Sequence, residues 1–365
     1  MPNWAKPMQQ SYEYYAVEPT TLADLKRLDN AKTASFSRDS TVETLGSATI
    51  DMTNSIGEAY VRCYLKTIQN GVTEKFPLGT VLVQTPRETF NGKITDVSMD
   101  AYTPLLELKE NPPPLGYTIR RGTRIMDAAY HIVRENARAP VNAVEPIFEI
   151  GSDGELIDVS PTLQKDFVAN TDDTWLSFLI ALIANARYEL GLDELGHILF
   201  LPMQELASLQ PVWAYNDDNS SILLPELTMD RDLYGIPNVV EVIYSYGGDY
   251  KTAVAINDDP NSPVSTVNRG RRITHRDPQP SLAGYVTDEQ VQAYAERLLR
   301  ALSTIEYTVS YTHGYCPVRI GDCVRLNYTA AGIHNVKAKV ISQNIKCSLP
   351  CQVSEKAVFT TKLWR

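Results

Sequence analysis

The sequence lacks the hydrophobic run that a membrane-spanning helix needs, which is about 20 residues long. Its longest apolar segment is WLSFLIALIANA, starting at Trp175, which is only about half of that length. It also lacks an excess of basic residues, because 34 Lys and Arg stand against 44 Asp and Glu, for a net charge of −10. Since binding to phosphates requires clustered Lys and Arg, we expect a chain that neither spans a membrane nor wraps nucleic acid.

The common signatures of catalysis are missing as well. The sequence has no HExxH metal motif, no GxSxG nucleophile turn, no GxxxxGK[ST] phosphate loop and no GxGxxG. Carboxylate pairs such as Asp172-Asp173 and Asp258-Asp259 lie at an expected helix start and in an expected turn, where Asp is favoured for structural reasons. We therefore assign no catalytic residue and expect no enzymatic activity.

What the sequence does contain is a multidomain pattern in which β-structure dominates. Its 365 residues are too many for one small core. The 43% hydrophobic and 21% charged residues are typical of a folded globular protein. Alternating or β-branched segments separated by Gly, Asn and Pro fill residues 43–108 and return after Pro211. The proline-rich KENPPPLG, from Lys109, marks a boundary at the end of the first β region.

Helical signals lie between and after these β regions. Thr123 is an expected N-cap for an amphipathic helix, and TDDTWLSFLIALIANARYEL predicts a central buried helix. Asp153-Gly154 between two apolar segments predicts a hairpin turn. Later in the chain, Thr287 and Gln290 form the pattern of a capping box at the start of another amphipathic helix.

These signals predict an α+β protein, mainly β, in which two β-domains flank a middle α/β domain. Each β-domain is expected to be a small sheet or barrel. The expected parts are an N-terminal arm (1–42), a first β-domain (43–110), a middle α/β domain (111–210), a second β-domain with helix 287–302 (211–330), and C-terminal strands (331–365).

One polar loop concentrates arginines within eight positions. The segment NRGRRITHRD contains Arg269, Arg271, Arg272 and Arg276. Such a group can bind phosphate, but in so acidic a chain an ion pair between subunits or a contact with a partner is the favoured interpretation. We therefore take these four arginines as interface candidates.

The cysteines are unevenly distributed. Cys63 stands alone and is expected to be a buried free thiol. The other four fall within 36 residues, and two of them flank Gly321-Asp322 in YCPVRIGDCVRLNY, where the simplest interpretation is a tight turn between strands. No cofactor is required, but thiolates favour zinc or an iron–sulfur cluster, so a structural metal site is one interpretation; disulfides and unlinked thiols are the others. The spacings match no standard metal motif. The candidate ligands are Cys316, Cys323, Cys347 and Cys351.

Taken in order, several segments resemble the baseplate hub proteins of tailed bacteriophages and related contractile machines. These segments are FPLGTVLVQTPRETFNGKITDVSMDAYTPLLEL, YTIRRGTRIMDAAYHIV, GLDELGHILFLPM, LYGIPNVVEVIYS, GRRITHRD and PVRIGDCVRL. The resemblance runs from about Glu43 to about Gln343. It implies a homotrimer in which each chain supplies two tube-like β-barrels, so that three chains form a pseudo-six-fold ring that matches the tail tube.

The same resemblance implies the partners and the location. The tail tube or distal tail protein would lie on one side of the ring, and a spike or central fibre protein would face the middle domain and the C-terminal segment (331–365). DNA would pass through the enclosed channel without sequence-specific binding. The protein would belong to the virion tail and be assembled in the host cytoplasm.

A different resemblance gives an alternative function. YTIRRGTRIMDAAYHIV is also similar to the start of the LysM cell-wall-binding module, although Thr123 stands where that module usually has Asp. This similarity implies a protein that binds or degrades peptidoglycan.

Overall fold

The chain folds into two compact units. Unit 1 comprises Met1–Glu226 and Tyr311–Lys356, and unit 2 comprises Leu227–Ser310 and Ala357–Arg365. The computed structural model describes residues 2–90, 92–93, 95–150, 155–218, 221–231, 233–278, 280–282 and 286–362.

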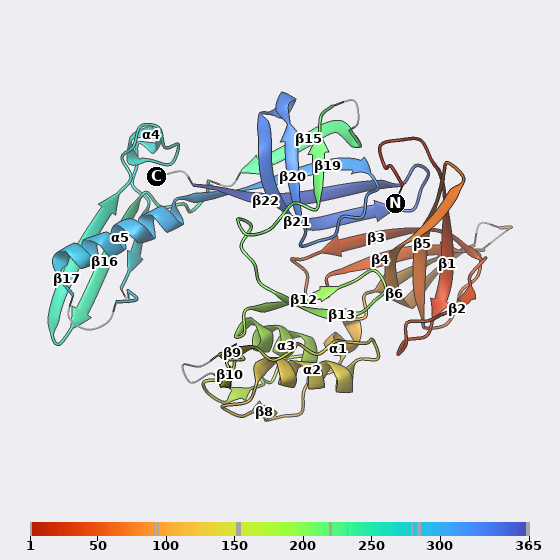
Figure 1. The fold of residues 1–365 in the computed structure, drawn as a ribbon, viewed down its shortest axis with the longest axis horizontal. Coiled ribbons are helices and arrows are strands. Elements are labelled where there is room, and N and C mark those ends of the chain that lie inside the picture. The colour runs from red at the N-terminus through yellow and green to blue at the C-terminus, as the bar shows by residue number, and fades with distance from the viewer. Residues whose placement is uncertain are drawn as a thin grey trace. The chain divides into compact units, whose positions relative to one another are not determined.

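A large sheet is built from strands of both ends of the chain (Figure 1). Its order is β15-β19-β22-β21-β3-β4-β7-β6-β5-β1-β2, and β20 and β14 branch from β21. Pairing from β21 to β2 is antiparallel, whereas β14 runs parallel to β20. The strands are β1 Gln9–Val17, β2 Asp24–Arg27, β3 Ala31–Asp39, β4 Gly46–Met52, β5 Ala59–Gln69, β6 Val72–Phe90, β7 Thr95–Tyr102, β14 Trp213–Asn216, β15 Leu223–Arg231, β19 Thr304–Gly314, β20 Cys323–Tyr328, β21 Ile333–Lys346 and β22 Gln352–Lys362, with a 3₁₀ turn at Thr329–Ala331.

The sheet joins the two β regions that the sequence predicts as separate domains. β3 pairs with β21, with Phe36 opposite Ile345, and both side chains are buried in one core together with Cys63 and Val353. The prediction of an α+β, mainly β fold is confirmed. Closure of each β region into a barrel stays a prediction.

The predicted N-terminal arm is wrong. Residues 9–17 form β1, which pairs along its whole length with β5, and β3 lies between β4 and β21. The sequence pattern did not reveal these strands because β1 carries mostly tyrosines and polar residues, and its buried apolar residues are Tyr14 and Val17. Residues 331–346 form the η1 turn and β21, so the predicted C-terminal segment is also part of the main sheet.

A middle domain of helices and short strands lies between β7 and β14 in the chain. Its elements are α1 Leu106–Glu110, β8 Thr118–Ile119, α2 Ile125–Asn136, β9 Phe148–Ile150, β10 Leu156–Asp158, β11 Phe167–Val168, α3 Trp175–Ala184, β12 Tyr188–Leu192 and β13 Ile198–Pro202. The helices pack together in a core that includes Ala129, Phe178 and Leu182. The apolar segment of the sequence therefore forms the central helix α3, as predicted.

Two local predictions in the middle domain have different outcomes. The N-cap of α2 is Arg124, which makes no side-chain cap bond, so Thr123 is not the cap. The reason is that Thr123 is used in backbone bonds, donating to Arg120 and accepting from Leu163. The Asp153-Gly154 turn lies outside the described residues, although β9 and β10 on either side of it form an antiparallel pair.

Unit 2 contains a separate three-stranded sheet with a helix packed against it. The sheet has the order β17-β16-β18, and α5 packs on β16 and β17 through Val291, Ala295 and Leu299. The predicted capping box of Thr287 and Gln290 is present. The predicted second domain (211–330) is therefore wrong in its limits, because residues 227–310 fold as a compact unit of their own. The elements are β16 Val239–Tyr246, β17 Asp249–Ile256, α4 Thr266–Arg269, β18 Thr274–Asp277 and α5 Asp288–Leu302.

Within the described residues, no helix combines the length and the apolar character needed to cross a membrane.

Candidate functional site

A turn between β12 and β13 brings an acidic side chain against two arginines from distant parts of the sheet. Glu194 Oε1 lies 3.4 Å from Arg38 Nη1, at the end of β3, and Glu194 Oε2 lies 2.7 Å from Arg319 Nη2, in the loop before β20. The Glu194 side chain is only 10% exposed. We call this set the Glu194 junction (Arg38, Glu194 and Arg319). It connects the middle domain to both β regions of the large sheet, the one that contains β3 and the one that contains β20.

The local sequence explains why the turn can approach the sheet so closely. Asp193 Oδ1 accepts the backbone N–H of His197 at 2.8 Å, which closes the turn. Gly196 has a φ of +98°, and a Cβ there would lie 3.1 Å from Thr80 Cβ. Thr80 in turn donates its hydroxyl to the Glu194 carbonyl at 3.1 Å. A larger residue at 196 would both strain the backbone and push the turn away from β6.

A second arginine group lies next to this turn, fully inside the protein. The Arg62 side chain on β5 is 3% exposed. Its guanidinium donates to Thr80 Oγ1 and Asp24 Oδ1, each at 2.8 Å. It also donates to the carbonyls of Leu22 at 3.0 Å and Leu195 at 2.8 Å. Because Leu195 belongs to the β12–β13 turn, Arg62 fixes the same turn from the other side.

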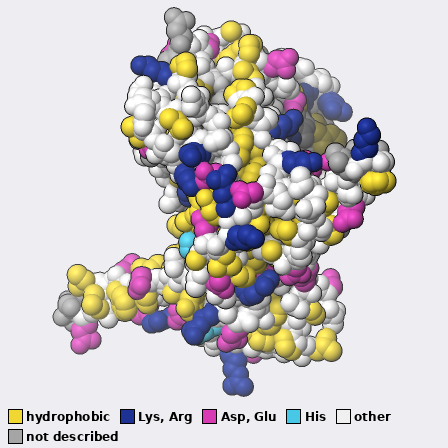
Figure 2. Space-filling model, turned by 90° about the vertical axis from the view of Figure 1, so that its right-hand side faces the viewer, with side chains coloured by type: hydrophobic (Ala, Val, Ile, Leu, Met, Phe, Trp, Pro, Cys, Tyr) yellow, Lys and Arg dark blue, Asp and Glu magenta, His cyan; other side chains and the backbone are white. Residues whose placement is uncertain are grey.

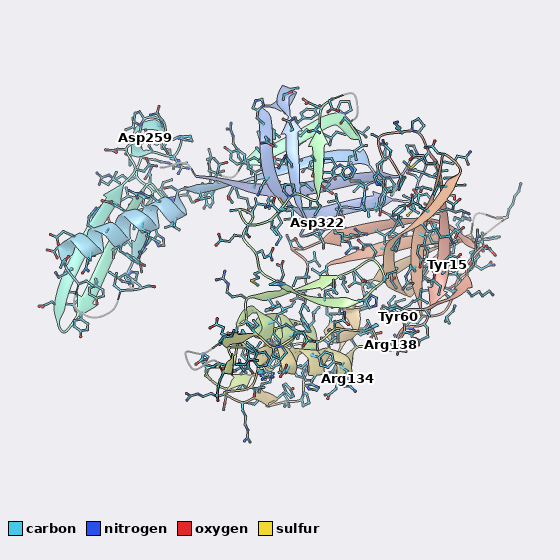
Figure 3. The ribbon with its side chains drawn as sticks, in the orientation of Figure 1. Tyr15, Tyr60, Arg134, Arg138, Asp259 and Asp322 are labelled. Atoms are coloured by element: carbon cyan, nitrogen blue, oxygen red, sulfur yellow. The ribbon has the colours of Figure 1, made fainter. Side chains whose placement is uncertain are left out.

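A third contact between the sheet and the middle domain is centred on Glu107 in α1. Tyr60 on β5 donates its hydroxyl to Glu107 Oε1 at 2.7 Å, and Arg138 Nε donates to the same oxygen at 2.7 Å. Figure 3 shows Tyr60 and Arg138 side by side, and the guanidinium carbon lies 5.3 Å from the Tyr60 ring centre. Burial, followed by the bond to Glu107, raises the pKa of Tyr60 well above its usual range, so the phenol stays protonated as the donor.

The Ile-Gly-Asp corner of YCPVRIGDCVRLNY is a turn, as the simplest interpretation predicts. Gly321 has a φ of +89°, and the Arg319 backbone N–H donates to Asp322 Oδ2 at 2.8 Å. Burial is the main cause that raises the pKa of the Asp322 carboxyl. Figure 3 labels the position of Asp322. The turn places Arg319 where it meets Glu194, so this segment contributes an ion pair that its cysteines do not take part in.

The four predicted cysteine ligands do not come together. Cys347 lies with its sulfur 3.8 Å from that of Cys63, and Cys351 is buried in the same core. Cys316 contacts Tyr215 and His313 instead, and Cys323 contacts the carbonyl of its own neighbour Val324. Across the part of the chain that the structure describes, no group of three or more His, Cys, Asp or Glu side chains has metal-binding geometry. All five cysteines are buried free thiols.

Cys316 belongs to a buried polar network that includes His313 and Glu355. His313 Nε2 lies 3.1 Å from the Tyr215 hydroxyl and 3.4 Å from Glu355 Oε2, and its Nδ1 lies 2.7 Å from the Gly314 carbonyl. Burial alone would lower the pKa of His313, but Cys316 and Glu355 beside it raise this pKa to about 10. Both ring nitrogens face acceptors, so the imidazole is held as a cation against Glu355.

This network resembles a nucleophile, a base and a carboxylate, but no substrate can reach it. The side chains of His313 and Glu355 are fully buried, and Cys316 is 1% exposed. Gln343 donates to Glu355 at 2.6 Å, and Tyr311 donates to its other oxygen. The arrangement therefore satisfies a buried ion pair and stabilises the β19–β22 region.

The four arginines that the sequence marks as interface candidates all lie in unit 2, where they have different roles. Arg269 donates to the carbonyls of Ile236 and Leu233, so it stabilises its own loop. Arg276 pairs with Glu241 at 2.7 Å while its side chain stays 73% exposed. Arg271 and Arg272 are exposed and lie next to this pair in the chain. Of the four candidates, Arg271, Arg272 and Arg276 are therefore accessible to a partner.

Sequence reasoning missed Arg38, Arg62, Glu194 and Arg319. The sequence does contain one signal, because the Asp-x-x-Gly turn in GLDELGHILFLPM indicates a tight corner between two strands. Nothing in the sequence pairs that corner with arginines more than 100 positions away. On the face shown in Figure 2, Lys and Arg side chains likewise lie beside Asp and Glu side chains, and they form no continuous basic surface there.

Comparisons with known proteins identify this architecture. No protein-family model matches the sequence, and no curated protein matches it either. Among solved structures, the tail protein from Neisseria meningitidis MC58 is similar, with a TM-score of 0.57 and 12% identity over 97% of this chain and 98% of that chain. The 43 kDa tail protein of prophage MuSo2 from Shewanella oneidensis gives a TM-score of 0.60 and 11% identity over 96% of this chain and 98% of that chain.

A chain of the Francisella PdpA–VgrG complex is similar over 97% of this chain but only 58% of its own length, with a TM-score of 0.53 and 8% identity. At such low identities the similarity establishes the fold: this chain has the fold of phage tail proteins.

Proposed function

We propose that this chain is a structural hub protein of a phage-type tail, located at the baseplate or tail tip. The observation that carries the proposal is the likeness to two tail proteins over 96% or more of this chain and 98% of each of theirs. A likeness of this extent includes both units and the middle domain, so it concerns the whole architecture and not one common module.

In this proposal three copies form a ring with pseudo-six-fold symmetry, between the tail tube or distal tail protein and a spike or central fibre protein. Both β regions join in one sheet, and the Glu194 junction and Glu107 hold the middle domain to that sheet. Such a connected subunit is what supports a place in a ring. The net charge of −10 suits a channel through which DNA passes without binding. An obligate ring of this kind buries about 2,000 Å² or more at each interface.

We also propose that the chain is not an enzyme. The Cys316, His313 and Glu355 group is the arrangement closest to a catalytic triad that we find among the described residues, and it is sealed from solvent. In the same proposal, the protein is located in the virion tail and is assembled in the host cytoplasm.

The test is co-assembly. The chain is expressed together with candidate tail tube and spike proteins, and mass photometry counts the subunits in the complex. We expect three copies of the 40.8 kDa chain per complex. A chain that remains monomeric in the presence of both partners would contradict the proposal.

A pulldown on purified peptidoglycan distinguishes the alternative function. A hub outside its assembly should stay in the supernatant, whereas a cell-wall-binding protein should sediment with the wall material.

A further inference from the structure

Two cysteines from distant parts of the chain meet in the core of the large sheet. Cys63 lies on β5, and Cys347 follows directly after β21. Their sulfurs are 3.8 Å apart, and the two residues are buried, with exposed fractions of 0% and 5%. A pair of thiols separated by 284 positions in the sequence therefore connects the two β regions of the sheet.

The backbone around the pair allows the two sulfurs to come closer. The sulfurs of a disulfide are about 2.0 Å apart, so the pair has to close by about 1.8 Å. The pairing of β5 with β6 is irregular directly after Cys63, which lies opposite Gly79. On the other side, Cys347 begins the turn to β22, and residues 348–350 of this turn are exposed. The approach can therefore be shared between a side-chain rotation and small shifts at these two places.

A buried tyrosine hydroxyl lies beside the pair. Tyr14 on β1 is opposite Cys63 in the register of β1 and β5, and it is only 4% exposed. Its hydroxyl is buried and has no partner at hydrogen-bonding geometry among the described residues. Burial, followed by the charge of an ionised Cys63, raises the pKa of Tyr14 well above its usual range, so the phenol keeps its proton. The hydroxyl is thus an unused donor for a thiolate on either sulfur.

The remaining cysteines have different neighbours. Cys316 contacts the Tyr215 hydroxyl at 3.3 Å, and Cys323 contacts the Val324 carbonyl at 3.9 Å. Cys351 lies in the same core as the pair and is the competing partner for Cys347. A bond between those two would close only the turn that they flank, whereas a bond to Cys63 would join β5 to the end of β21.

We propose that Cys63 and Cys347 form a modification site at which a peroxide, with hydrogen peroxide as the simplest, converts two thiols into a disulfide. In the first step, the Cys347 sulfur loses its proton and attacks one oxygen of the peroxide. An S–O bond forms, the O–O bond breaks, and the departing hydroxide takes up a proton to leave as water. In the second step, the Cys63 sulfur attacks the sulfur of this sulfenic acid, so that the S–S bond forms, the S–O bond breaks and a second water leaves. The two sulfurs lose two electrons in total, and the peroxide gains them.

Burial sets the order and the speed of these steps. Burial is the main cause that raises the pKa of the Cys63 thiol, so Cys63 stays protonated at neutral pH and reacts second. Cys347 reacts first because it is next to the exposed turn, and the reaction is slow because this turn has to open for the peroxide. A reducing cytoplasm keeps both groups as thiols, and the disulfide closes outside it. The site needs no tail partner, so its failure would leave the proposed function untouched.

The test uses the full chain, folded and free of partners. Reduced protein is incubated with excess hydrogen peroxide and then denatured in N-ethylmaleimide, which labels every remaining thiol. Intact mass spectrometry should count three labels in place of the five that the five free cysteines give without peroxide. Peptide mapping without reductant should find the Cys63 peptide joined to the Cys347 peptide.

Three results of this experiment would overturn the inference. The first is five labels on the treated protein, and the second is a disulfide between Cys347 and Cys351. The third is an oxide of Cys347 in protein whose Cys63 still carries its label, because Cys63 would then be unable to complete the reaction.

A second measurement tests whether the bond joins the two β regions. A disulfide that closes so long a loop should raise the thermal midpoint by about 5 °C or more, and a reductant should reverse the change. Cys347→Ala should lose both the cross-link and this shift, whereas Cys351→Ala, the control from the same core, should keep both. The mapping of the wild type decides if Cys347→Ala does not fold. Equal responses of the two variants to peroxide, or an unchanged midpoint in cross-linked wild type, would contradict the proposal.

Discussion

Two sets of arginines in this chain are brought together in different ways. The first set (269–276) is contiguous in sequence, and the side chain of Arg276 in it is 73% exposed. The second set consists of Arg38, Arg62 and Arg319, which come from three distant segments and meet at one turn. The Arg62 side chain is 3% exposed. Arg38 is 16% exposed, whereas Arg319 remains 52% exposed. Clustering of charge in the sequence thus marks a solvated loop, while the topology of the sheet buries Arg62 and most of Arg38.

The difference matters for stability. Exposed ion pairs contribute about 0–1 kcal/mol, because water and salt screen them. Removing one partner of a buried pair costs about 3–5 kcal/mol, because the other partner is left without compensation. If the two sets differ as their burial indicates, substitutions in them should differ severalfold in effect.

The largest effect is expected for Arg62→Met. The change leaves the carbonyls of Leu22 and Leu195 without their donor and takes the cation away from Asp24, at a cost of about 3–5 kcal/mol in the free energy of unfolding. Urea denaturation followed by far-ultraviolet circular dichroism measures this in both units, because each unit contains helices and strands. Arg276→Met is the matched control and should cost less than about 1 kcal/mol. Equal losses for the two variants would abolish the distinction between the sets.

Glu194→Gln should have the next largest effect. The amide keeps the shape of the side chain but removes the negative charge between Arg38 and Arg319, and we expect a loss of about 2 kcal/mol. The control is Glu189→Gln, because Glu189 is 40% exposed and pairs with Lys339 at 3.2 Å. A Glu194 variant as stable as its control would mean that the junction adds nothing to the stability of unit 1.

The pH dependence of stability tests the buried His313. Because its folded pKa is raised to about 10, above the unfolded value of 6.5, its contribution is complete below pH 6.5 and is lost as the pH rises towards 10. The free energy of unfolding should therefore fall by about 1 kcal/mol from pH 7 to pH 8 through this group. Denaturation of the wild type and of His313→Gln at both pH values isolates the contribution of His313.

The contribution of His313 is the part of the pH dependence that the Gln variant lacks. Parallel pH profiles for the two proteins would contradict a charged imidazole in the folded state.

The smallest effect is expected from metal removal. The sulfurs of Cys316 and Cys323 lie apart from those of Cys347 and Cys351, so a chelator should leave the thermal midpoint unchanged within about 1 °C. Elemental analysis of protein purified without oxygen or chelator should find less than about 0.1 equivalent of zinc or iron per chain. A full equivalent of either metal would require the four cysteines to gather in a conformation other than this one.

Periodicity in the sequence predicted the elements whose burial pattern repeats. Helix α5 could be predicted from its capping box and apolar face, and α3 from its continuous apolar run. The turn of the β16–β17 hairpin is Gly247-Gly248, both of which have positive φ. In each case the signal and the structure are local, within about 20 residues.

What could not be predicted depends on contacts between distant segments. β1 looks polar, and it becomes a strand because β5 offers it nine paired positions. The predicted boundaries of the second domain were wrong because residues 227–310 fold around α5, while β20 and β21 belong to the large sheet. The Glu194 junction could not be predicted for the same reason, because its two arginines, Arg38 and Arg319, lie near opposite ends of the chain.

If three copies of this chain form a ring at the end of a tail tube, an electron cryomicroscopy reconstruction of the tail tip should show them. We expect density for three copies of the fold around the tube axis, with the Glu194 junction intact in each copy. A tail tip without this fold, or one with a single copy off the axis, would contradict it.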